Sequence, residues 1–165
     1  MGREASMDWG HFLFGFSGRI NRAKYWLWVL IYFVAAIVVA VVMAVINSDM
    51  VGGIVQFAFS VAAFISALAI MSKRLHDRNK SAWWILLFVV VPMILLGIGI
   101  GAAVYGVIVS GADAANFDFG KLGAVGIVCL LATLAIYIWA FVELGCLRGT
   151  VGPNQYGADP LEGKI

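Results

Sequence analysis

The stretch YWLWVLIYFVAAIVVAVVMAVI (residues 25–46) is continuously apolar and contains no charged residue. A helix of about 20 residues crosses the roughly 30 Å of hydrocarbon in a bilayer. A membrane β-strand would instead alternate apolar and polar residues at every second position, and no such alternation occurs here. The stretch therefore predicts a membrane-spanning helix.

Three more stretches of the same kind follow, at residues 51–72, 81–109 and 122–142. The chain is 63% hydrophobic and 12% charged, whereas average soluble domains are about half apolar and a quarter charged. This composition excludes an ordinary water-soluble fold. We expect an all-α integral membrane bundle of four transmembrane helices, forming a single domain over residues 1–165, with a polar tail at residues 143–165.

The distribution of Lys and Arg predicts how the spans are oriented. These residues are abundant before the first span, between the second and third spans, and in the tail, whereas Lys121 alone lies in the other two loops. Positive residues near helix ends are retained in the cytoplasm. The N-terminus and the C-terminus are therefore both predicted to be cytoplasmic.

The segment WGHFLFGF (residues 9–16) is rich in aromatic residues but too short to cross a bilayer. Because basic residues follow it directly, we expect a short interfacial segment before the first helix. Asn21 then offers an N-cap to that helix. The first apolar run lacks a cleavage pattern and is expected to be retained.

The third span contains features that affect helix packing. Pro92 removes a backbone donor and crowds the preceding turn, which predicts a tilt or kink. Gly97 and Gly101 have GxxxG spacing, which lets a neighbouring helix approach closely. We expect them to pack inside this bundle, with a homo-oligomer contact as the alternative.

The spans offer little for chemistry. Their notable polar side chains are Gln56, Ser60, Ser66 and Thr133, and no Asp, Glu, Lys, Arg or His lies at mid-bilayer. This disfavours an ion-coupled pump and an intramembrane hydrolase. Neither a cofactor nor a metal site is expected, because His and Cys form no cluster at ligand spacing. The basic residues form no patterned surface for nucleic acid.

Most of the polar side chains are instead predicted to meet at the cytoplasmic ends of the helices. They are Arg19, Asn21, Arg22, Arg74, His76, Asp77, Arg78, Glu143, Arg148, Asn154 and Asp159. Glu143 directly follows apolar residues, where an unpaired carboxylate is costly, so we expect it to pair with Arg74 or Arg19. His76 and Asp77 could be an acid–base pair, but adjacent helical residues point apart and structural pairing is favoured.

Three segments resemble a bacterial inner-membrane family catalogued only as domain of unknown function 805. They are FSGRINRAKYW (16–26), RLHDRNKSAWW (74–84) and GTVGPNQYGADP (149–160). The family pattern adds Trp26, Trp84 and Tyr156 to the predicted cluster, and Gly152, Gly157 and Pro160 also fall on that pattern. Ala82 replaces a usual glycine and Lys73 a common arginine. The resemblance implies an inner-membrane location and a tail that folds back onto residues 74–77, but no activity.

These observations leave three hypotheses for function. The leading one is a non-enzymatic accessory or scaffold protein, binding a membrane complex or anionic lipid through its cytoplasmic polar face. The second is a small-solute channel or transporter, with Gly97 and Gly101 at a subunit contact. The third is an enzyme that acts on lipid headgroups through His76 and Asp77.

Overall fold

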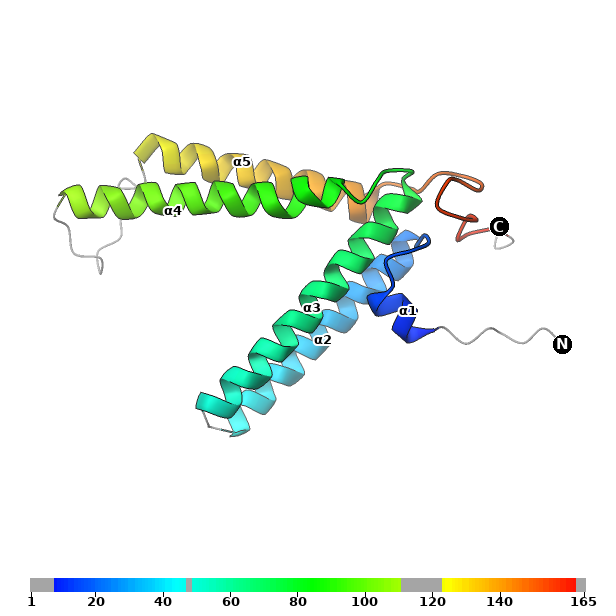
Figure 1. The fold of residues 1–165 in the computed structure, drawn as a ribbon, viewed down its shortest axis with the longest axis horizontal. Helices are drawn as coiled ribbons and strands as arrows, with labels where there is room; N and C mark the ends of the chain where they lie inside the picture. Colours follow the sequence, from blue (N-terminus) through cyan, green and yellow to red (C-terminus); the bar gives the residue numbers. More distant parts are fainter. Residues whose placement is uncertain (1–7, 47–48, 111–122, 163–165) are drawn as a thin grey trace. The chain divides into compact units, whose positions relative to one another are not determined.

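The computed structural model describes residues 8–46, 49–110 and 123–162 (Figure 1). These residues form helices α1 (Trp9–Phe14), α2 (Arg22–Ile46), α3 (Asp49–Asp77), α4 (Val91–Ser110) and α5 (Gly123–Phe141), with π-helical turns η1 (Leu86–Val90) and η3 (Val142–Cys146). Four helical segments of this part of the chain are long and apolar enough to cross a membrane. The prediction of an all-α protein with four spans is confirmed.

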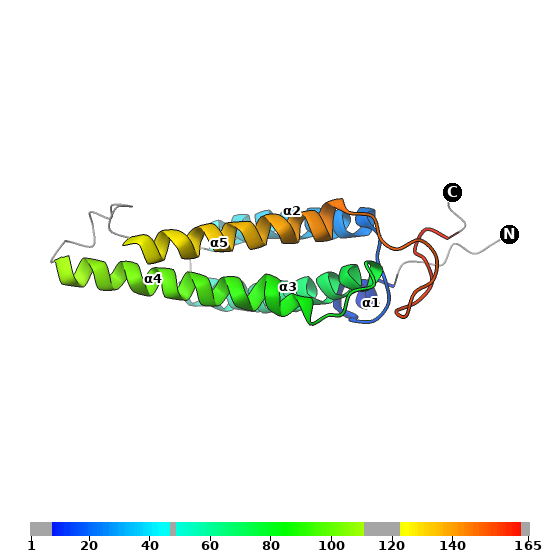
Figure 2. The same ribbon diagram turned by 90° about the horizontal axis from the view of Figure 1, so that it is seen from above.

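The chain divides into two compact units. Unit 1 comprises residues 1–82 and 144–165, and unit 2 comprises residues 83–143. In unit 1, α2 and α3 lie side by side as a hairpin, and in unit 2, α4 and α5 do the same (Figures 1 and 2). The single-domain prediction and the orientation of the termini stay predictions.

The first two spans extend beyond their predicted limits. Helix α2 begins at Arg22, and the Asn21 side chain accepts a hydrogen bond from the Lys24 N–H at 2.9 Å, which confirms the N-cap. Helix α3 continues past residue 72 to Asp77. Asn79 then takes a left-handed conformation with φ 55°, a common way to end a helix.

The distortion expected at Pro92 takes the form of the π turn η1. The Val91 N–H donates to the Leu86 carbonyl, five residues back instead of four. A proline ring crowds the carbonyl four residues before it, and the wider π turn gives that carbonyl room. Pro92 itself is fully buried.

Helices α4 and α5 approach closely at Gly99. A Cβ placed on Gly99 would lie 3.4 Å from the Cys129 Cβ and 3.7 Å from the Gly126 carbonyl oxygen. Cβ positions on Gly97 and Gly101 have no described atom within 4 Å. Gly99 therefore allows a close contact inside this hairpin, and the packing roles of Gly97 and Gly101 stay predictions.

Helix α1 packs onto unit 1 through Phe12, with Leu13 against the same apolar cluster. Phe12 is 5% exposed and packs against Ile20 and Ile70. Trp9, Phe14 and Phe16 remain about half exposed. An apolar surface of this kind suits the predicted interfacial placement.

Candidate functional site

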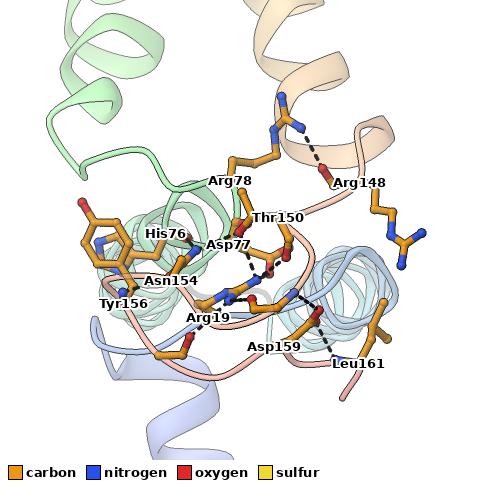
Figure 3. Close-up of polar contacts among 12 residues, drawn as sticks. Arg19, His76, Asp77, Arg78, Arg148, Thr150, Asn154, Tyr156, Asp159 and Leu161 are labelled. Carbon is orange, nitrogen blue, oxygen red and sulfur yellow. Dashed lines mark hydrogen bonds and ion pairs between the residues drawn. The ribbon is translucent and has the colours of Figure 1, made fainter. Parts of the chain in front are cut away.

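The polar residues of unit 1 gather around Arg19 (Figure 3). Its guanidinium lies 3.1 Å from the Asp77 carboxylate and donates to the carbonyls of Thr150 at 2.7 Å, Gly152 at 2.8 Å and Gly157 at 3.1 Å. The Arg19 side chain is 1% exposed. Because a guanidinium presents five N–H groups in a rigid fork, one side chain fixes both a helix end and the tail.

Asp77 is shared by two arginines. Its Oδ1 faces Arg19, and its Oδ2 accepts from Arg74 Nη1 at 2.5 Å. Other N–H groups of Arg74 donate to the carbonyls of Leu144, at 2.7 Å, and Leu147. Arg74 is completely buried, so these partners replace the water that its charge would otherwise need.

The tail closes the end of α3. The Thr150 N–H donates to the Asp77 carbonyl at 2.8 Å, and the Thr150 hydroxyl donates to the same oxygen at 3.1 Å. Asn154 Nδ2 donates to the His76 carbonyl at 2.9 Å. The last carbonyls of a helix have no hydrogen-bond donor within the helix, and here the tail supplies the donors. The predicted fold-back of the tail onto residues 74–77 is confirmed.

Within the tail, Asn154 and Gly157 form a β-bridge, with both N–H···O distances at 3.0 Å. This turn presents Tyr156 to His76, and the two rings stack with centroids 3.9 Å apart and planes 6° apart (Figure 3). His76 Nδ1 lies 3.2 Å from the Gly18 carbonyl oxygen and is the donor in that contact, since a carbonyl only accepts. The imidazole is therefore held from two sides.

Asp159 organises the far side of the tail. Its carboxylate accepts backbone N–H bonds from Gly152 and Leu161, both at 2.9 Å. These two bonds hold the pKa of Asp159 below its ordinary value, because they favour the charged form. At Gly149 the chain passes so close to Asp77 that a Cβ would overlap its carboxylate, so the position requires glycine.

Arg22 and Trp26 bind carbonyls at the C-terminal end of the fourth span. Trp26 Nε1 donates to the Gly145 carbonyl at 3.1 Å, and Arg22 Nη1 donates to the Cys146 carbonyl at 2.9 Å. These carbonyls belong to the end of η3, where intrahelical partners run out. The positive charge of Arg22 also interacts favourably with the negative end of the helix dipole at the end of η3.

All predicted cluster residues except Trp84 and Glu143 lie in unit 1. Unit 1 brings together Arg19, Asn21, Arg22, Trp26, Arg74, His76, Asp77, Arg78, Arg148, Asn154, Tyr156 and Asp159. Trp84 packs instead against Trp139 of unit 2, with ring centroids 5.7 Å apart. Glu143 is 3% exposed in unit 2, and its pairing with Arg74 or Arg19 stays a prediction.

Sequence reasoning did not select Thr150, Gly149 and Lys73 as site residues. Thr150 and Gly149 lie inside the tail segment that carries the family resemblance, which is the signal that could have found them. Lys73 is 2% exposed, and its Nζ donates to the carbonyls of His11 at 2.9 Å and Phe12 at 2.5 Å. It thereby caps the end of α1.

The arrangement is built to hold residues in place. A cavity of about 20 Å³ beside Asp77 and Arg148 is large enough for a single water molecule. Within residues 8–46, 49–110 and 123–162, no group of three His, Cys, Asp or Glu side chains could hold a metal ion. Both Asp77 oxygens and the His76 ring are already engaged.

Comparisons with known proteins identify the family. A family model described as "Protein of unknown function (DUF805)" matches residues 13–158. The Escherichia coli (strain K12) protein YiiR is 30% identical over 153 residues, covering 92% of this chain and 90% of YiiR. No solved structure matches the chain.

Two further relatives are named for their location. The inner membrane protein YhaH of E. coli (strain K12) is 32% identical over 78 residues, which are 46% of this chain and 64% of YhaH. The inner membrane protein YhaI of that strain is 33% identical over 76 residues, 46% of this chain and 63% of YhaI. The matches thus span less than two thirds of these relatives. With its four membrane-length helices, the chain is a multi-pass inner-membrane protein that belongs to the DUF805 family.

Proposed function

We propose that this protein is a non-enzymatic accessory or scaffold protein of the inner membrane. Its cytoplasmic polar face, formed by unit 1, binds a partner membrane complex or anionic lipid. The observation that carries the proposal is that the buried polar groups of unit 1 form hydrogen bonds and ion pairs with one another and with the tail. Arg19 alone bonds the Asp77 carboxylate and three tail carbonyls, and so holds a rigid surface.

Rigid internal pairing favours recognition over turnover. A general acid or base must reach the substrate proton that it transfers. The Asp77 carboxylate accepts from arginines at both oxygens, and His76 is stacked on Tyr156. These contacts support a structural role for His76 and Asp77, the pair that the enzyme hypothesis invoked.

The edge of this surface is basic. Arg22, Lys24 and Arg148, here called the basic edge, have no carboxylate within 4.0 Å among the residues that the structure describes. Arg22 and Arg148 are exposed, and Lys24 is half-buried. Basic side chains beside a membrane attract anionic headgroups and acidic partner surfaces.

The test is quantitative mass spectrometry of the protein purified from native membranes in mild detergent. Arg148→Glu reverses a charge on the basic edge without removing a described side-chain hydrogen bond. Lys121→Glu is the matched control, because the sequence predicts Lys121 in an outer loop. We expect a stoichiometric partner or anionic lipid that Arg148→Glu weakens and Lys121→Glu retains.

Two results would contradict this function. One is a purified protein that carries neither a partner nor anionic lipid. The other is solute flux in reconstituted vesicles that bulky replacements at Gly97 and Gly101 abolish, which would support the channel or transporter hypothesis.

A further inference from the structure

A second, larger cavity lies beside α1 in unit 1. Its volume is about 210 Å³, and its lining includes His11, Phe12, Ser17, Lys24 and Lys73. One water needs roughly 10–15 Å³, and pockets for drug-sized ligands begin at roughly 300 Å³. The cavity therefore suits a small polar group such as a phosphate.

Lys73 brings a buried positive charge to this cavity. Its ammonium has three N–H groups, and two of them are used by the carbonyls of His11 and Phe12. No carboxylate of the described residues lies within 4.0 Å of it. A buried ammonium without a counter-ion is costly, so an anion in the cavity would stabilise it.

Lys24 adds a second positive charge. Its backbone N–H is bound to Asn21, but its side chain makes no hydrogen bond or ion pair with the described residues. Lys24 and Lys73 both line this cavity. Asp8 is the one carboxylate among the lining residues, and its Oδ1 accepts from the His11 N–H at 3.1 Å.

The surroundings of the cavity indicate where the anion comes from. Trp9, Phe14 and Phe16 are 51%, 47% and 48% exposed, although all three are large aromatic residues. Aromatic side chains favour the headgroup level of a membrane, and lysines extend their ammonium groups to the same level. A phosphate that reaches Lys24 and Lys73 there would be attached to a lipid.

We propose that this cavity binds the phosphate of an anionic phospholipid, with Lys24 and Lys73 as its cationic ligands. The inference rests on the proposed function and names the lipid class and the place where it binds. Free phosphate has the same chemistry, so the experiment must separate the two sources.

The experiment measures lipid binding to the full chain in detergent by native mass spectrometry. The three probes are phosphatidylglycerol, the zwitterionic phosphatidylcholine and inorganic phosphate. We expect retention of phosphatidylglycerol alone. Equal binding of inorganic phosphate, or equal retention of phosphatidylcholine, would overturn the proposal of an anionic lipid.

A pair of variants locates the site. Lys24→Gln should weaken phosphatidylglycerol binding about fivefold, the effect of removing one basic side chain near a membrane surface. Lys24→Gln should fold normally, because the Lys24 side chain has no polar partner among the described residues. Lys80→Gln makes the same charge change outside the cavity lining and should leave the affinity unchanged.

The failures of the two proposals can be told apart. Unchanged affinity in Lys24→Gln, or equal weakening in Lys80→Gln, would overturn the cavity site. If a partner complex still co-purifies in that case, the accessory function stands without it. A protein that retains neither lipid nor partner would overturn both.

Discussion

Units 1 and 2 each contain a hairpin of two long apolar helices, but different interactions hold them together. Unit 1 uses buried arginines, such as Arg19, which contacts residues 131 to 138 positions away. The described part of unit 2 contains one charged side chain, Glu143, and its helices meet at Gly99 and Trp139. Burial from lipid gives little driving force between helices, so specificity must come from polar contacts or close packing. This protein uses one solution in each unit.

The difference predicts how far the effect of a substitution extends. In unit 1 the polar contacts join the N-terminal segment, the end of α3 and the tail. Removing one partner leaves several buried groups unsatisfied at once, and such effects are not additive. In unit 2 the contacts join neighbouring turns of α4 and α5, so a substitution should act locally.

The largest effect is expected for Arg19→Met. This change removes every bond from the guanidinium to Asp77, Thr150, Gly152 and Gly157. Breaking a buried ion pair from one side costs about 3–5 kcal/mol. We expect a loss of that size in the free energy of unfolding in mixed micelles, with protease cleavage of the tail.

Arg22→Gln is the matched control for Arg19→Met. Among the residues that the structure describes, the Arg22 side chain makes one exposed hydrogen bond, to the Cys146 carbonyl, so its loss should cost about 1 kcal/mol. If the tail of Arg19→Met stayed as protected as in the wild type, the polar cluster would not be what fastens it.

The next effect is expected for Gly149→Ala. The added methyl group would overlap the Asp77 carboxylate, and forced overpacking costs about 1–3 kcal/mol. Gly97→Ala adds the same group where no described atom lies within 4 Å. Differential stability in mixed micelles should therefore separate the two variants. An equal loss in Gly97→Ala would reveal the helix contact that the GxxxG spacing predicts.

A smaller pair of effects should differ in sign between the units. Thr133 Oγ1 in unit 2 is buried and has no hydrogen-bond partner in the described structure, so Thr133→Val should raise stability by about 1 kcal/mol. In unit 1, Ser66 Oγ accepts from Trp28 Nε1 at 2.8 Å, so Ser66→Ala should lower it by about 1 kcal/mol. Thermal unfolding in detergent would show both shifts. A destabilised Thr133→Val would mean that the hydroxyl has a partner.

The spans could be predicted from the sequence because length and apolar composition are local properties. Their ends were harder to predict. The second span was expected to stop at residue 72, before the first charged side chain, but Lys73, Arg74 and Asp77 continue the helix. They do so because carbonyls from α1 and the tail, together with Arg19, bind them inside unit 1. Those partners are distant in sequence, so no local pattern reports them.

Much of the candidate site could be named in advance, but not how it is connected. Charge near helix ends selected Arg19, Arg74 and Asp77, whereas Tyr156 came from the family resemblance. Thr150 contributes through backbone groups as well as its hydroxyl, and backbone groups leave no mark on the residue pattern. The pairing of Asp77 with two arginines also depended on the tail geometry, which the sequence does not specify.

The smallest expected effect is the pH dependence of tail docking. Because the folded protein lowers the pKa of Asp159, the stability from this carboxylate is fully present above its unfolded pKa of about 3.9. That contribution is lost as the pH falls through the lowered folded value. The difference in hydrogen-exchange protection of the segment 149–161 between the wild type and Asp159→Asn should therefore stay constant between about pH 7 and pH 5.

Below about pH 4 the two proteins should begin to converge, and they should coincide once the pH is below the lowered folded pKa of Asp159, where the wild-type carboxyl group is neutral, as the side-chain amide of Asp159→Asn is at every pH. The comparison with the variant cancels the titration of other carboxylates, such as Asp77, that the two proteins share. Parallel profiles over the whole range would mean that the Gly152 and Leu161 N–H bonds do not depend on the Asp159 charge. The tail would then be held by the neutral contacts of Thr150 and Asn154 together with Arg19.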